Sequence, residues 1–134
     1  MTPEQARDAL ITKVAAATAL LLPGMLVVYE NADGVSIDTA PAFFLRVSID
    51  FDRAAQASME AAPITRYEGE LNLTHMMKEG TGTKALLARI ELLNAELRHL
   101  SLGDLQLAVP YPSDKGSPAG WYYQAWSIPF WFHD

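Results

Sequence analysis

Phe43-Phe44-Leu45-Arg46-Val47-Ser48-Ile49-Asp50-Phe51-Asp52 is the stretch of this sequence that decides the fold. Every second residue in it is apolar, and the residues between are mostly polar. Side chains of a β-strand point alternately to its two faces, so this alternation predicts a strand with one buried face and one wetter face. We expect the rest of the chain to pack on the buried face.

The segment from Ile64 to Met76 alternates in the same way and is the expected partner of this strand in an antiparallel hairpin. One register matches the apolar faces and also pairs opposite charges on the polar face. It sets Ile49 opposite Tyr67, Leu45 opposite Leu71, Asp50 opposite Arg66, and Arg46 opposite Glu70. Because cross-strand pairs contribute about 0.2–1 kcal/mol each, we expect this register.

Two helices are predicted, one on each side of the hairpin. Thr2-Pro3-Glu4 is typical of a helix start, an apolar stripe repeats to Leu21, and Pro23-Gly24 ends the pattern. A second stripe predicts a helix over about residues 84–100, with His99 in its last turn and Gly103 as its stop. A short strand is predicted over residues 25–30.

The C-terminal part of the chain predicts two further strands. Leu105, Leu107 and Val109 alternate, whereas Pro110 to Gly120 is rich in proline and glycine and predicts a loop. The last strand runs from Trp121 to Phe132, with its even-numbered residues in the core, and Pro129 predicts that it lies at an edge or carries a bulge.

The order helix, three strands, helix, two strands predicts an α+β fold. We expect one domain over residues 1–134, with a mostly antiparallel or mixed sheet of about five strands and two helices packed on one face.

The composition narrows the function classes. The 134 residues suit one domain, and the formal net charge of −6 disfavours non-specific binding to nucleic acid, which depends on Lys and Arg at phosphates. There is no cysteine, the three histidines share no metal-ligand spacing, and no apolar run approaches the ~20 residues of a membrane span. No nucleophile motif appears either, so we expect no catalysis, no metal and no cofactor.

Three surfaces are candidates for interaction. The charged face of the hairpin carries Arg46, Asp50, Arg66, Glu68 and Glu70. The connection over residues 53–63 is longer than a tight turn and holds Gln56, Ser58 and Met59; a binding loop and a loop without function fit it equally well. The third surface is a row of aromatic side chains, Tyr111, Trp121, Tyr123 and Trp131. Such a row is typical of a subunit interface, unless the second face of the sheet is covered within the subunit.

Four carboxylates on the hairpin allow a different function. If Asp50, Asp52, Glu68 and Glu70 converge, they suit Mg²⁺ and the phosphoryl chemistry of a phosphodiesterase or nuclease. A solvated or subunit-facing charged surface explains the same residues. We favour this second interpretation, because the expected register already gives Asp50 and Glu70 cationic partners.

Several short motifs occur here in a familiar order. They are Tyr29-Glu30-Asn31, Pro41 before the alternating strand, Arg66-Tyr67-Glu68-Gly69-Glu70-Leu71, Gly80-Thr81-Gly82 before a helix, and Gly120-Trp121-Tyr122 running to Ile128-Pro129-Phe130. In this order the chain resembles the tail terminator proteins of long-tailed bacteriophages, the lambda-like family, over about residues 25–132. Small head–tail connector and neck proteins share the size and the α+β texture and remain alternatives.

The resemblance implies a structural protein of the virion tail, assembled in the host cytoplasm. Members form a hexameric ring on the last ring of the major tail tube protein and stop tube growth. The other ring face meets a head completion or stopper protein, and DNA passes through the ring without specific binding. In this chain we expect the charged hairpin face and the aromatic C-terminal strand to join subunits, and the 53–63 loop to face the tube.

Overall fold

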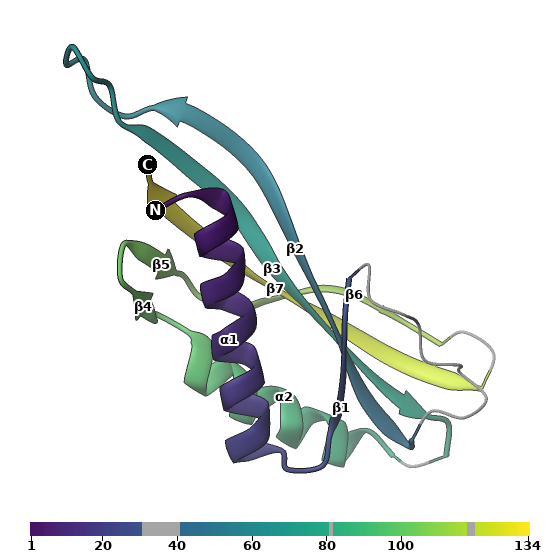
Figure 1. Ribbon diagram of the computed structural model, residues 1–134. Coiled ribbons are helices and arrows are strands. Elements are labelled where there is room, and N and C mark those ends of the chain that lie inside the picture. The colour runs from purple at the N-terminus through teal and green to yellow at the C-terminus, as the bar shows by residue number, and fades with distance from the viewer. Residues whose placement is uncertain (31–40, 81, 118–119) are drawn as a thin grey trace.

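The computed structural model describes residues 1–30, 41–80, 82–117 and 120–134, and Figure 1 shows its elements. Within these ranges the order is helix, three strands, helix, four strands, so the C-terminal part contributes four strands where two were predicted. The α+β class is as predicted. The bounds are α1 Pro3–Leu21, β1 Leu26–Tyr29, β2 Phe43–Gln56, β3 Thr65–Lys78, α2 Thr83–Leu97, β4 Ser101–Leu102, β5 Leu105–Leu107, β6 Tyr111–Gly116 and β7 Trp121–His133.

The described strands join one mixed sheet of seven strands, which is larger than the predicted sheet of about five. Its order is β1-β2-β3-β7-β5-β4, with β6 pairing with β7 as well. β1 runs parallel to β2, and the other pairings are antiparallel. The long strands β2, β3 and β7 therefore form the middle of the sheet.

One face of the sheet is covered by both helices (Figure 1). This face carries the odd-numbered side chains of β2 up to Phe51, the odd-numbered side chains of β3 and the even-numbered side chains of β7. Together with the apolar stripes of the helices they form two buried clusters. Leu45, Val47 and Ile49 are at most 7% exposed, so the predicted buried face is confirmed for them. Phe51, at the far end of the same face, is 42% exposed.

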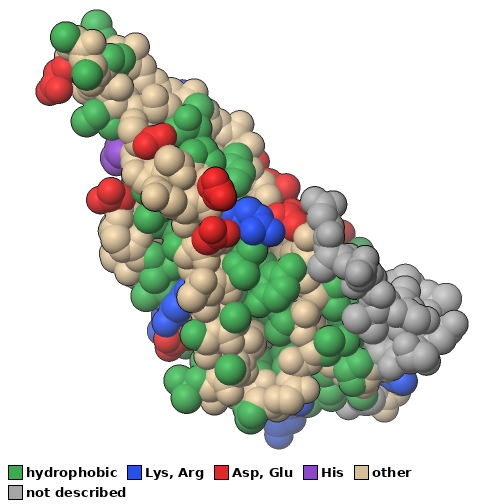
Figure 2. Space-filling view, viewed as in Figure 1, with side chains coloured by type: hydrophobic (Ala, Val, Ile, Leu, Met, Phe, Trp, Pro, Cys, Tyr) green, Lys and Arg blue, Asp and Glu red, His purple; other side chains and the backbone are tan. Residues whose placement is uncertain are grey.

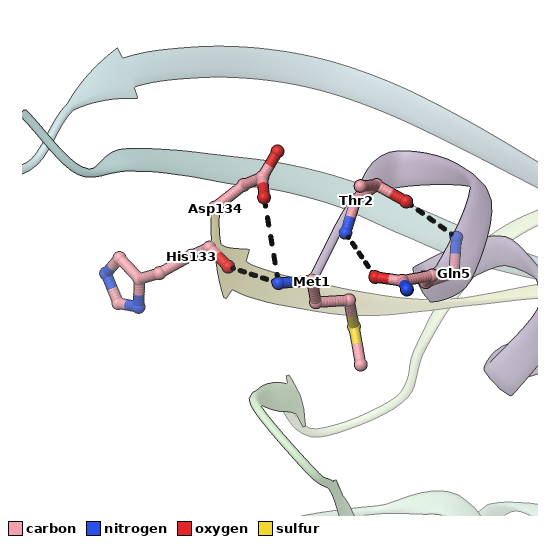
Figure 3. Close-up of polar contacts among 5 residues, drawn as sticks. All are labelled: Met1, Thr2, Gln5, His133 and Asp134. Carbon is pink, nitrogen blue, oxygen red and sulfur yellow. Dashed lines mark hydrogen bonds and ion pairs between the residues drawn. The ribbon is translucent and has the colours of Figure 1, made fainter.

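α1 begins where the sequence predicts. The Thr2 hydroxyl accepts a hydrogen bond from the Gln5 N–H at 3.2 Å, and the Gln5 side chain accepts one from the Thr2 N–H at 2.9 Å, which completes a capping box (Figure 3). Lys13 and Glu96 form an ion pair of 2.8 Å between α1 and α2. The predicted stripe is buried at Ala6, Leu10, Val14 and Ala17.

α2 ends earlier than predicted. Its last residue is Leu97, and His99 lies beyond the helix with φ of 55°, the left-handed conformation that often follows a helix end. Gly103, the predicted stop, lies instead in the turn between β4 and β5 with φ of 62°. Within the described chain, neither helix is both long and apolar enough to cross a membrane.

The predicted loop over residues 110–120 contains β6, so that prediction is wrong over Tyr111–Gly116. β6 pairs with β7 and shifts register between Pro112 and Asp114. An edge strand with a bulge tolerates proline, because its outer side has no ladder to break. The prolines and glycines misled the prediction for this reason.

β7 is an inner strand, so the predicted edge position of Pro129 is also wrong. β3 pairs along one side of β7, whereas β6 and β5 follow one another along the other side. The Pro129 carbonyl accepts from the Ala108 N–H at 2.8 Å. In an antiparallel strand the N–H and C=O of one residue point toward the same neighbouring strand. The N–H that Pro129 lacks would therefore point to the junction between β5 and β6, where no ladder hydrogen bond is lost.

The first and last residues of the chain lie side by side (Figure 3). The Met1 amino group donates to the His133 carbonyl at 3.2 Å and lies 3.7 Å from a carboxylate oxygen of Asp134. These contacts tie the start of α1 to the end of β7.

Candidate interaction surfaces

The β2–β3 hairpin projects beyond the body of the fold (Figure 1). Strand pairing continues to Gln56 and Thr65, so the connection spans residues 57–64 rather than 53–63. The register shifts between Phe51 and Arg53, and β2 resumes after this bulge. The alanines that follow have low β propensity, which hid the continuation from sequence analysis. We call residues 56–65 the hairpin arm.

The tip of the arm is ordered by its own hydrogen bonds. The Gln56 amide donates to the Ser58 carbonyl at 2.6 Å, the Ile64 N–H donates to the Ser58 hydroxyl at 3.0 Å, and the Ala57 N–H donates to the Ile64 carbonyl at 2.7 Å. Two of the three predicted loop residues thus shape the tip. The third, Met59, is 95% exposed.

Apolar side chains gather at the end of the arm, with acidic atoms beside them (Figure 2). Ile64 is 42% exposed, and Glu60 is the one charged residue in the 57–64 connection. An ordered, projecting, mainly apolar surface is typical of a contact site for another protein.

The register of the hairpin differs from the predicted one by four residues. Ile49 lies opposite Leu71 instead of Tyr67, and Leu45 lies opposite His75. An even shift keeps every side chain on its predicted face, so the alternation of the sequence identified the faces but not the register. The turn lies later in the chain than predicted, because pairing extends past the bulge.

The predicted charge pairs therefore do not form. Arg46 lies opposite Thr74, and Asp50 lies opposite Glu70. The five candidate residues of the charged face do share one face, the one turned away from the helices, which we call the second face: Arg46, Asp50, Arg66, Glu68 and Glu70.

Asp50 and Glu70 are neighbours although both are acidic, and each carboxylate accepts a hydrogen bond. Asn72 donates to Asp50 at 2.7 Å, and the Tyr111 hydroxyl donates to Glu70. The hydrogen bond to Glu70 raises the pKa of Tyr111. Desolvation, followed by the charges of Glu70 and Asp50, raises the pKa of Asp52. Donors from β3 and β6 thus replace the arginines that the prediction placed here.

Arg66, Glu68 and Trp131 form a compact patch at the base of the arm. The Arg66 Nε lies 2.9 Å from a Glu68 carboxylate oxygen, and the guanidinium carbon lies 5.3 Å from the centre of the Trp131 ring. In the described residues, no three acidic or histidine side chains gather as a metal ion would require. Glu68 is held by Arg66, as Asp50 and Glu70 are held by their donors.

The aromatic row of the C-terminal strand is only partly available for contact. Trp121 is 4% exposed and packs edge-on against Phe44 at 5.0 Å between ring centroids, so its predicted exposure is wrong. Tyr123 is half-buried and its hydroxyl donates to Asp114 at 3.0 Å. Trp131 is half-buried and Tyr111 is 40% exposed. Trp121 stabilises the fold because Phe44, Met76 and neighbouring apolar residues enclose it.

A groove of about 400 Å³ lies at the other end of β2. Its lining includes Leu21, Leu22, Met25, Phe43 and Arg89, which come from the end of α1, the chain after it, the start of β2, and α2. The guanidinium carbon of Arg89 lies 4.0 Å from the centre of the Phe43 ring. The Nε of Arg89 is buried and has no hydrogen-bond partner among the described residues. Sequence analysis did not find this site, because it joins three separate segments.

His75 is a second residue whose environment the sequence does not reveal. It is 1% exposed on the helix-covered face, between Leu45 and Gln124 in register. Burial lowers the pKa of His75 to about 4, and its Nε2 has no hydrogen-bond partner in the described chain. His75 is therefore neutral at physiological pH.

Comparison with known proteins identifies the fold and no more. No family model matches the chain, and no curated protein matches it. Among the solved structures that match, one protein designated only by a sequence identifier has a TM-score of 0.73 at 16% identity, covering 98% of this chain and 96% of its own. At this identity the likeness concerns the fold, so the architecture recurs in another protein along nearly its whole length.

Proposed function

We propose that this protein is a structural assembly protein of the phage tail: a terminator that forms a ring on the head-proximal end of the tail tube. In this role it ends tube polymerisation and offers a surface to a head completion or stopper protein. A related head–tail connector of the same size is the alternative within this class. A metal-dependent phosphodiesterase is the alternative outside it.

The observation that carries the proposal is the hairpin arm. Its tip is held in shape by Gln56 and Ser58 but presents Met59 almost fully to solvent. Ordering a surface of this kind brings a monomer little stability, whereas it prepares a contact with another protein. The arm supports a role in assembly, and the resemblance of the sequence to tail terminators supports the choice of assembly.

The second face gives weaker support. Its acidic residues accept hydrogen bonds or ion pairs from side chains of the same chain, and Tyr111, Tyr123 and Trp131 are partly accessible. A polar, partly aromatic face of this kind suits a contact with another protein.

Reconstitution with tail tubes tests the proposal. Purified protein is mixed with tubes of the major tail tube protein and imaged by negative-stain electron microscopy, and native mass spectrometry reports its oligomeric state. We expect caps at one end of each tube and no further growth when tube protein is added. Bare tubes that continue to grow would reject the terminator function.

A plasmid-cleavage assay with Mg²⁺ or Mn²⁺ separates the enzymatic alternative. Metal-dependent cleavage that disappears in Asp50→Ala and Glu68→Ala would favour a phosphodiesterase. Capping of tubes by the same two variants would place these carboxylates outside the capping contact.

A further inference from the structure

The arm and the groove lie at opposite ends of one strand. β2 has 14 residues and runs from Phe43, which lines the groove, to Gln56, where the arm begins. At about 3.3 Å per residue these ends are roughly 40 Å apart, and Figure 1 shows them at opposite ends of the molecule. A contact between arm and groove therefore requires two copies of the chain.

The two sites are chemically complementary. The groove has apolar walls and one cation, Arg89, and the 57–64 connection is mainly apolar with one anion, Glu60. Stacking on Phe43 fixes the plane of the Arg89 guanidinium, so its edge can donate two parallel hydrogen bonds to a carboxylate.

We propose that the hairpin arm of one copy docks in the groove of the next copy, with Met59 against the apolar walls and the Glu60 carboxylate on Arg89. This inference rests on the proposed assembly function and names the partner of the arm. The contact joins different surfaces of identical chains, which is the heterologous type, and such a contact produces a ring when the rotation between successive copies closes. In this proposal the tip of the arm binds a second copy of the chain, whereas the sequence analysis expected it to face the tail tube.

A charge-reversal cycle tests the contact. The variants are Glu60→Arg, Arg89→Glu and the double variant, and self-association is followed by native mass spectrometry and sedimentation over a range of concentrations. We expect each single reversal to weaken self-association about tenfold or more, and the double variant to recover most of the loss. Glu91→Arg, an exposed reversal on the same helix as Arg89, is the matched control and should assemble normally.

Cross-linking provides a second readout, because a covalent link captures contacts that the variants form only transiently. The chain has no cysteine, so Glu60→Cys combined with Arg89→Cys carries two unique thiols. We expect a short bis-maleimide to produce a ladder of covalent multimers, whereas Glu60→Cys with Glu91→Cys should produce none. The melting temperature of Arg89→Gln is measured as a control. An unchanged value shows that loss of the Arg89 charge does not itself unfold the protein.

The outcomes separate this contact from the proposed function. A wild-type protein that stays monomeric, together with a Glu60→Cys/Arg89→Cys variant that gives no ladder, overturns the contact, even if the wild type caps tubes. Single reversals that form normal rings but fail to cap tubes assign the arm to the tube and also overturn it. Recovery of assembly in the double variant with bare tubes supports the contact and rejects the terminator function.

Discussion

Gly69 is the residue on which the close packing of the hairpin depends. A Cβ atom there would lie 2.2 Å from the Asp50 carbonyl oxygen and 2.6 Å from the tip of the Phe130 ring. Phe51, opposite Gly69 and next to the bulge, packs edge-on on Phe130 with 5.7 Å between ring centroids. The rings close over the glycine and leave no space for a side chain.

Gly69→Ala should lower the free energy of unfolding by about 1–3 kcal/mol or more, measured by chemical denaturation. Adding Phe130→Leu should recover little of this loss, because the backbone oxygen of Asp50 remains in the way. Full recovery in the double variant would show that the ring alone is the obstacle.

His75 makes stability depend on pH. Its pKa is about 4 in the folded chain, below the ordinary value of 6.5, because burial disfavours the charged form. The unfolded chain therefore takes up the proton first, and stability falls as the pH drops from about 6.5 to 4. The loss attributable to His75 should reach about 3 kcal/mol below pH 4.

Denaturation at a series of pH values checks this expectation. His75→Leu removes the titrating group and should flatten the profile between pH 6.5 and 4. If the wild type and the variant lose stability in parallel, His75 does not titrate as its environment requires.

Two tryptophans of β7 should differ in their contribution to stability. Trp121→Ala should cost about 3–5 kcal/mol, because the side chain is enclosed with Phe44 and Met76. Trp131→Ala should cost clearly less, because the ring is only half-buried and lies beneath the Arg66 guanidinium. Equal losses in thermal melts would contradict the different burial of the two side chains.

At the scale of elements, residues at the tip of the β2–β3 hairpin should affect assembly, whereas residues nearer its base should affect the stability of the fold. Met59→Ser should change the free energy of unfolding by no more than about 0.5 kcal/mol, since the side chain is 95% exposed, and should weaken assembly. Phe51→Ser, in the same hairpin, should instead destabilise the fold, because the ring packs on Phe130 and Phe132. Denaturation and native mass spectrometry on both variants check the contrast.

The elements also show what a sequence pattern can predict. Alternation identified the buried faces of β2 and β3, and capping residues located the start of α1, since both signals are local. Register and strand length were not predictable, because they depend on the bulge after Phe51 and on the glycine opposite it. β6 was missed because its one proline, Pro112, is tolerated at a sheet edge, and that position is a property of the whole sheet.

At the scale of the molecule, the class of fold was predictable from the sequence, whereas the sites that join distant segments were not. The candidate residues of the second face were found because they alternate within single strands. The groove was not, because Leu21, Phe43 and Arg89 meet only after two helices and the sheet have packed. The same limit applies to Trp121, whose burial depends on a partner strand.

The meeting of Met1 with His133 has a consequence for how the chain can be rearranged. Because the ends touch, a short linker from Asp134 to Met1 should make the backbone almost a closed circle that can be opened elsewhere. A circular permutant opened between Met59 and Glu60 should keep its far-UV circular dichroism and melt near the parent protein. It should nevertheless fail to assemble, because its new ends would split the arm: a folded subunit with no means of joining its neighbours.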